Sequence, residues 1–156
     1  ATVLFTDVVG STEMAARMGD ESWRGLLDQH DATTARVVAR HEGRVVSGTG
    51  DGVMASFDSP SSAIDAAVEL VRELSGAGVT IRAGLHTGEV VPRGDEIGGM
   101  AVHIAARVGA EAGAGQVLVS STTRDLVVGG GRTLTEVGTR RLKGVADEWL
   151  LYEVSG

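Results

Sequence analysis

Hydrophobic and polar residues follow one another along the chain in blocks that predict alternating strands and helices. The chain opens on a short β-branched and apolar run, residues 2–6, which predicts a buried strand. A helix start follows at residues 11–13, and residues 21–41 carry apolar side chains at helical spacing. Gly43 is expected to end that helix. The first part of the chain therefore predicts one strand followed by helical structure.

The middle of the chain predicts a hairpin, a helix and another strand. Residues 44–57, with the sequence RVVSGTGDGVMASF, contain two short apolar runs around a glycine-rich turn, which is typical of a β-hairpin. Residues 63–74 are alanine-rich and amphipathic, so they predict a helix, for which Ser59 and Pro60 supply the start signal. The stretch VTIRAGLHTGEVV, residues 79–91, predicts the next strand.

The last part of the chain predicts a helix over residues 98–112, a strand over 115–120, a short helix over 121–127 and a final hairpin over 133–154. The order strand, helix, strand, strand, helix, strand is the split βαβ arrangement of ferredoxin-like domains, an α/β (α+β) fold, here with a C-terminal β-hairpin. In that arrangement the first strand and the central hairpin lie side by side in one sheet. We expect one domain over residues 1–156, cut from a longer chain.

The net charge and the lack of cysteine limit the kinds of partner and site that the chain can have. The 156 residues carry a formal net charge of -7, which argues against a nucleic-acid-binding or membrane-binding surface, because attraction to phosphate backbones needs a positive excess. The absence of cysteine excludes disulfides and thiolate metal sites and suits a reducing compartment. We therefore expect a cytoplasmic domain that makes no direct membrane contact, whatever attaches its parent chain to a membrane.

Two carboxylates are candidates for a metal site. The stretch FTDVVGST ends an apolar run on Asp7 and continues into a loop of small and hydroxyl-bearing residues. Asp51 lies at the turn of the predicted hairpin, so the expected sheet places it beside Asp7. Two converging carboxylates repel each other unless a divalent cation lies between them, and a small-residue loop before a helix suits a phosphate. The alternative is that Asp7 only caps the helix that follows.

Five sequence blocks also carry a family resemblance. They are FTDVVGST, GRVVSGTGDGVMASF, IRAGLHTGEV, GMAVHIAARV and LKGV, and they span nearly the whole chain. In order and spacing they resemble the catalytic domain of class III nucleotidyl cyclases, most closely its actinobacterial-type adenylyl cyclases. The resemblance implies conversion of ATP to 3',5'-cyclic AMP and pyrophosphate with two divalent cations, Mg²⁺ or Mn²⁺.

The resemblance also implies a role for residues at one end of the first strand. The metal-binding aspartates of the family match Asp7 and Asp51, and the backbone carbonyl of Val8 is a further expected ligand. The loop that follows is expected to present N–H groups and hydroxyls to the phosphates at a helix N-terminus, where the helix dipole favours anions. That loop consists of Val9, Gly10, Ser11 and Thr12.

Three basic residues match positions that bind or stabilise phosphate groups. Arg107 matches the arginine that stabilises charge growing on the α-phosphate in the transition state, since a guanidinium can bind two phosphate oxygens at once. Lys143 matches a phosphate-binding lysine on the last hairpin, and Arg82 matches a basic residue near the triphosphate. Without the resemblance each is an ordinary surface charge.

Three positions concern the ribose and the base. The family usually places asparagine four residues before Arg107, to position the ribose, and this chain has His103 there. Adenylyl cyclases usually read the purine with a lysine at the position of Ser47, whereas guanylyl cyclases are expected to show glutamate. The second base-reading position falls on Glu96, with Asp95 beside it. A carboxylate there accepts hydrogen bonds from the adenine amino group, so adenine is favoured.

The resemblance finally implies a homodimer. In the family the metal-binding aspartates of one subunit meet the purine-reading and transition-state residues of its partner, so two copies share two equivalent sites. Two other functions stay open. One is a catalytically weak nucleotide-binding module for regulation or dimerisation, or a cyclase with a relaxed choice between ATP and GTP, as Ser47 and His103 suggest. The other is a different metal-dependent phosphoryl-transfer enzyme, such as a relative of the diguanylate cyclases, although the chain lacks a GG(D/E)EF-like hairpin.

Overall fold

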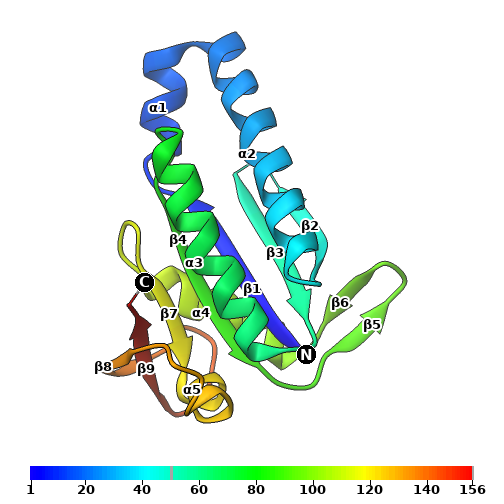
Figure 1. Cartoon of the computed structure of the whole chain (residues 1–156), viewed down its shortest axis with the longest axis vertical. Helices are drawn as coiled ribbons and strands as arrows, with labels where there is room; N and C mark the ends of the chain where they lie inside the picture. The colour runs from blue at the N-terminus through cyan, green and yellow to red at the C-terminus, as the bar shows by residue number, and fades with distance from the viewer. Residues whose placement is uncertain (50, 156) are drawn as a thin grey trace.

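A mixed β-sheet forms the centre of the protein (Figure 1). In this computed structural model, which describes residues 1–49 and 51–155, seven strands pair in the order β2-β3-β1-β4-β7-β9-β8. The β4–β7 pair is parallel, and the other neighbours are antiparallel. The strands are β1 (Thr2–Val8), β2 (Arg44–Thr49), β3 (Gly52–Phe57), β4 (Ile81–Thr87), β7 (Val117–Ser120), β8 (Leu134–Arg141) and β9 (Glu148–Val154).

Helices cover both faces of this sheet. Figure 1 shows α2 and α3 in front of the sheet and α4 behind it, with α1 and the start of α2 extending beyond the strands. The start of α3 agrees with the predicted signal, because the Ser59 side chain accepts a hydrogen bond from the N–H of Ser62 and Pro60 opens the helix. The helices are α1 (Ser11–Met18), α2 (Asp20–Arg40), α3 (Pro60–Gly76), α4 (Met100–Glu111) and α5 (Ser121–Val127).

The first strand is buried on both faces. Leu4 packs into the apolar cluster under α2 and α3, and Val3 packs into a separate cluster under α4. A strand covered on both sides shows a nearly continuous apolar run instead of an alternating one. This explains why residues 2–6 predict a buried strand. In the sheet, β1 pairs with β3 on one side and with β4, the central strand, on the other.

The helix α4 lies in direct backbone contact with β4. A Cβ atom added to Gly84 would lie 2.1 Å from the backbone nitrogen of Gly109 and 2.4 Å from its Cα. No side chain therefore separates the strand from the helix at this point. The contact holds α4, which carries His103 and Arg107, close to the sheet.

The structure corrects the prediction of one long strand over residues 79–91. The strand β4 ends at Thr87, and a separate two-stranded hairpin follows, made of β5 (Val91–Arg93) and β6 (Glu96–Gly98). Figure 1 shows this hairpin projecting from the side of the sheet. Its turn contains Gly94 at φ 62°, a left-handed conformation that glycine adopts without steric cost.

The helical region after β1 also differs from the prediction at its boundaries. It forms two helices that meet at Gly19, and the second ends at Arg40, one residue before the predicted end at residue 41; the left-handed residue that follows is Glu42, at φ 62°, and not Gly43. The first begins at Ser11, as expected, but its N-cap is Gly10 in a left-handed conformation and no side chain caps it. The helix α5 and the final hairpin confirm the predictions for residues 121–127 and 133–154. Within the described residues, no helix combines the length and apolar character needed to span a membrane.

Candidate functional site

Asp7 lies at the end of β1 and is held by an arginine on the neighbouring strand. In the β1–β4 ladder Asp7 is directly opposite Arg82. The Arg82 Nη2 and Nε groups donate hydrogen bonds to the Oδ2 atom of Asp7, at 2.9 and 3.2 Å. The carboxylate therefore does not cap the following helix, and the helix-cap alternative is wrong.

Asp51 is brought to the same end of the neighbouring strand. The β1–β3 ladder pairs Thr6 with Val53, so the next position of β1, Asp7, reaches the start of β3, which Asp51 precedes. This confirms the predicted adjacency of β1 and the central hairpin. In residues 1–49 and 51–155, no cluster of three or more His, Cys, Asp or Glu side chains forms a metal site by itself. Two carboxylates still fit Mg²⁺ or Mn²⁺, because such ions retain waters and take substrate phosphates as further oxygen ligands.

A cleft of about 410 Å³ opens between the sheet and α4 beside these residues. Its wall is mainly apolar and includes Phe5, Met54, Val102 and Ala106, while Asp7, Arg82 and Ser47 supply polar groups. An apolar cleft with a few polar groups at one end is the usual form of a small-molecule site. A flat aromatic base fits the apolar wall, and a charged group fits the polar end.

A second hollow, of about 350 Å³, adjoins the first at Asp7 and Arg82. It is lined by Val8, the predicted backbone metal ligand, and by Val9 and Gly10, the first two residues of the predicted phosphate loop. The N–H of Val9 donates to the carbonyl oxygen of Thr80 at 2.8 Å, so this amide is already engaged. The first N–H groups of α1, from Ser11 onward, have no side-chain cap and stand at the positive end of a helix dipole. The loop can therefore bind an anion beyond Val9.

Ser47 lines the cleft because β2 contains an irregularity. The ladder pairs Val45 with Ala55 and Ser47 with Met54, which leaves Val46 without a partner on β3. An extra residue of this kind bends a strand and turns the following side chain. Ser47 thus faces the same cleft as Asp7.

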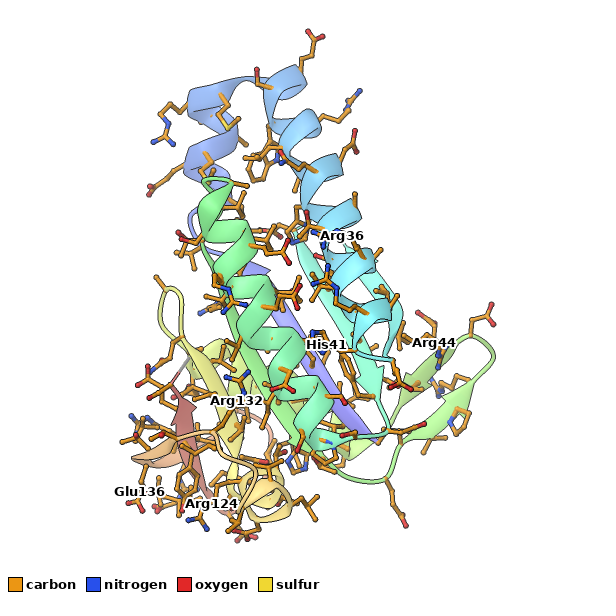
Figure 2. All side chains as sticks on the ribbon, in the orientation of Figure 1. Arg36, His41, Arg44, Arg124, Arg132 and Glu136 are labelled. Carbon is orange, nitrogen blue, oxygen red and sulfur yellow. The ribbon has the colours of Figure 1, made fainter. Side chains whose placement is uncertain are left out.

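The projecting hairpin brings Glu96 and Asp95 to the edge of β2. Ile97 of β6 and Val46 of β2 pack against one apolar cluster. Figure 2 shows Arg44 reaching toward the hairpin, and its Nη1 group donates to the carbonyl oxygen of Asp95 at 3.0 Å. Glu96 itself is exposed and does not line the 410 Å³ cleft, so its base-reading role stays a prediction.

His103 and Arg107 lie one turn apart on α4, beside the stripe that faces the cleft. Val102 and Ala106 line the cleft, whereas Arg107 does not. The Nε atom of Arg107 is buried and has no hydrogen-bond partner among the described residues. Buried donors without a partner are uncommon, so this guanidinium is a candidate for binding a ligand or a partner. Among the described residues, the two hollows that Asp7 lines do not include Arg107.

Lys143 is brought close to His103 by the turn that follows β8. The side chain of Leu142 is buried and anchors this turn in the cluster between α4 and the sheet. At Gly144 the backbone approaches the helix, because a Cβ atom there would lie 3.1 Å from Nε2 of His103. The neighbouring Lys143 is exposed. The fold therefore brings the backbone next to Lys143 up to His103, which lies one turn before Arg107 on α4.

His86 belongs to the same sequence block as Arg82 but lies away from the cleft. Its Nδ1 atom is 2.6 Å from the hydroxyl oxygen of Ser120, and its ring meets Trp149 edge-on at 5.3 Å between centroids. Only 4% of the residue surface is exposed, and this burial lowers the pKa of His86 to about 4. The imidazole is therefore a neutral structural group at neutral pH.

The Asp7–Arg82 ion pair is the feature of the site that the sequence did not indicate. The sequence identified Arg82 only as a basic residue near phosphates. Its pairing with Asp7 depends on the register between β1 and β4, in which residues far apart in sequence become direct partners. The alternation of side chains along a strand excludes a slip of one residue, but it does not identify which residue of the neighbouring strand lies directly opposite.

Comparisons with known proteins identify a family for the chain and solved structures with the same fold. The model of the adenylate and guanylate cyclase catalytic domain family matches residues 1–156. An uncharacterised protein of Mycobacterium tuberculosis is 34% identical over 125 residues, which cover 79% of this chain and 33% of that protein, so the chain spans about a third of that relative. The fold resembles that of the adenylyl cyclase CyaB from P. aeruginosa, with a TM-score of 0.88, 21% identity, and coverage of 99% and 93% of the two chains. It also resembles the guanylate cyclase domain of RhGC from Catenaria anguillulae in complex with GTP, with a TM-score of 0.84, 20% identity, and coverage of 99% and 94%.

Proposed function

Because the chain belongs to the adenylate and guanylate cyclase catalytic domain family, we propose that it converts ATP to 3',5'-cyclic AMP and pyrophosphate. The ribose 3'-oxygen forms a bond to the α-phosphorus, the bond from that phosphorus to the bridging oxygen of the β-phosphate breaks, and the hydroxyl proton is released. The supporting observation is the convergence of Asp7, the start of β3 and the glycine-containing loop at one end of an apolar cleft. A diguanylate cyclase relative is not supported by the family match.

The proposed metal ligands are the Asp7 and Asp51 carboxylates and the carbonyl oxygen of Val8. Two bound Mg²⁺ or Mn²⁺ ions would supply activation of the ribose hydroxyl and neutralisation of the departing pyrophosphate. Asp7 lies near the end of β1 and Asp51 directly precedes β3, so the rigid sheet positions both aspartates. The carboxylate and carbonyl oxygens suit these hard cations.

The remaining proposed roles are carried out by side chains and backbone groups of the protein, without a metal ion. The loop from Gly10 to Thr12 binds phosphate oxygens through N–H groups at the start of α1. Arg107 stabilises charge on the α-phosphate, and its Nε group, which has no partner among the described residues, is one available donor. His103 positions the ribose and Lys143 binds phosphate.

We further propose that two copies of the chain complete each site. Arg107 does not line the cleft that contains Asp7 in one chain, although both are expected to act on one triphosphate. A symmetric homodimer joins the Asp7 cleft of one copy to the α4 residues of the other. Each dimer then contains two equivalent sites, and a single chain is inactive.

Mixing two inactive variants tests the catalytic site and the dimer together. Asp7→Ala and Arg107→Ala should each abolish cyclic AMP formation alone. In an equal mixture half of the dimers are heterodimers with one intact site, so activity should recover to about a quarter of that of the unmodified chain. Asp28→Ala, which removes an exposed carboxylate on α2, is the matched control and should retain full activity. No recovery in a mixture that forms heterodimers would refute the shared site.

The choice of base is tested at Ser47. This side chain lines the apolar cleft, so Ser47→Lys should increase product formation from ATP while leaving GTP little affected. Equal use of ATP and GTP by both forms would refute the assignment of Ser47 and Glu96 to the purine. A chain that binds nucleotide but forms no cyclic product in Mg²⁺ or Mn²⁺ would instead support the second candidate, a regulatory nucleotide-binding module, which the residues Ser47 and His103 favour.

A further inference from the structure

The Asp7–Arg82 pair is fixed by three hydrogen bonds of one guanidinium. Arg82 donates twice to Oδ2 of Asp7, through Nη2 and Nε, and its Nη1 group donates to the carbonyl oxygen of Ala110 at 3.2 Å. The first contact joins neighbouring strands and the second reaches the C-terminal end of α4. The guanidinium is therefore held by Asp7 of β1 on one side and by the backbone of α4 on the other.

The pair stands at the boundary between the cleft and the phosphate-loop hollow. Both Asp7 and Arg82 line the two cavities. Their side chains are 45% and 33% exposed, so ions from solvent can reach them. Arginine stays charged at every pH that proteins tolerate, which means that Arg82 neutralises one of the two candidate metal-binding carboxylates. A divalent cation that uses Oδ2 must displace these hydrogen bonds.

We propose that Arg82, which the family resemblance already places near the triphosphate, is an internal counter-ion of Asp7, and that a divalent cation at Asp7 displaces it toward those phosphates. The inference rests on the proposed function, since the phosphates are those of the nucleoside triphosphate. A cation on Asp7 repels the guanidinium, while the contact with Ala110 keeps the arginine beside the hollow lined by Val9 and Gly10. The positive charge of Arg82 thus pairs with the Asp7 carboxylate before the metal binds, and with the substrate phosphates once the metal and the nucleotide are bound.

This exchange gives Arg82 opposite effects on two binding reactions. In the absence of nucleotide, Arg82 competes with the metal and weakens its binding. With a metal and a triphosphate present, Arg82 contributes hydrogen bonds to phosphate oxygens and strengthens nucleotide binding. A residue that only stabilises the sheet would change both affinities in the same direction.

The experiment measures the binding of Mn²⁺ alone and of α,β-methylene-ATP in saturating Mn²⁺. Free Mn²⁺ is followed by its electron paramagnetic resonance signal, and nucleotide binding is followed by calorimetry. For Arg82→Gln we expect Mn²⁺ alone to bind about fivefold more tightly, as removal of a partly exposed ion pair predicts, and the nucleotide analogue to bind at least about tenfold more weakly. Arg82→Lys, which keeps the charge but loses the forked geometry, should be intermediate in both assays.

Two controls isolate the contact. Arg24→Gln removes an equal charge from an exposed position on α2 and should change neither affinity. In an Asp7→Asn background, Arg82→Gln should no longer increase Mn²⁺ affinity, because the contested carboxylate is absent. Unchanged or weaker Mn²⁺ binding by folded Arg82→Gln and Arg82→Lys overturns the inference. The proposed function fails separately, if the unmodified chain forms no cyclic nucleotide while the opposed changes in affinity are still observed.

Discussion

Replacing Gly84 by alanine tests how closely α4 must approach the sheet. The new Cβ atom would lie 2.1 Å from the backbone nitrogen of Gly109 and 2.7 Å from the carbonyl carbon of Val108, whereas ordinary contact begins at 3.4 Å. The helix would have to retreat by about 1.3 Å, the difference between 3.4 and 2.1 Å. The obstructing atoms belong to the backbone and cannot rotate away. We therefore expect a loss at the upper end of overpacking costs, about 3 kcal/mol, in the free energy of unfolding.

The assay is urea unfolding followed by circular dichroism, with thermal unfolding as a second measurement. In a domain of this length, about 3 kcal/mol corresponds to a decrease in Tm of roughly 6–12 °C. Gly109→Ala is the matched control, because its Cβ would lie 3.5 Å from the nitrogen of Gly84 and 3.6 Å from Cβ of Phe5. Alanine also favours the helix by about 0.5–1 kcal/mol, so this variant should be as stable as the unmodified chain or more stable.

Equal stability of the Gly84→Ala variant and the unmodified chain would refute the steric argument, as would a Gly109→Ala variant that loses as much as Gly84→Ala. The same displacement of α4 should also move His103 and Arg107 in the proposed site, because both residues lie on this helix. At a temperature where Gly84→Ala is fully folded, its rate of cyclic nucleotide formation should still be reduced by about tenfold or more, as expected when a catalytic group is moved by 1 Å.

Two further predictions concern the interior. Since the pKa of buried His86 is lowered to about 4, below the value near 6.5 of the unfolded chain, its stabilising effect is complete above about pH 6.5 and is lost as the pH falls toward 4. Denaturant titrations should show a loss of up to about 3 kcal/mol over that range, and His86→Gln should remove this part of the pH dependence; an unchanged pH profile would contradict the assignment. Gly43→Ala would place a Cβ atom 2.3 Å from the ring of Phe57, so it should destabilise the protein by about 1–3 kcal/mol in the same titration, whereas Gly76→Ala, with nothing within 4 Å, should not.

Much of the fold could be predicted because its signals are local. The continuous apolar run of β1, the Ser59 and Pro60 start of α3 and the glycine-rich turn of the central hairpin each follow from neighbouring residues. The order of these elements is that of a split βαβ domain, which places Asp7 beside the hairpin that carries Asp51. The adjacency of β1 and the hairpin that carries Asp51 was therefore predictable from the sequence.

The features that the sequence did not predict depend on register or on short elements. The strands β5 and β6 contain three residues each, too few for a periodic pattern, and Pro92 lies within one of them. The pairing of Asp7 with Arg82 requires the register between β1 and β4. The closeness of Gly84 and Gly109 requires knowledge of which helix covers which strand. None of these is encoded in the spacing of residues along one segment.

The position of β1 between β3 and β4 has a consequence for biosynthesis. A ribosome makes β1 before the other strands of this sheet, but the strands that satisfy its two hydrogen-bonding edges begin only at Gly52 and Ile81. Until Thr87 has left the exit tunnel, the nascent chain contains an apolar strand with at least one open edge, which is a template for aggregation. The nascent chain should therefore depend on chaperone protection during this interval. A truncated translation product that lacks β4 cannot form the surroundings of Asp7.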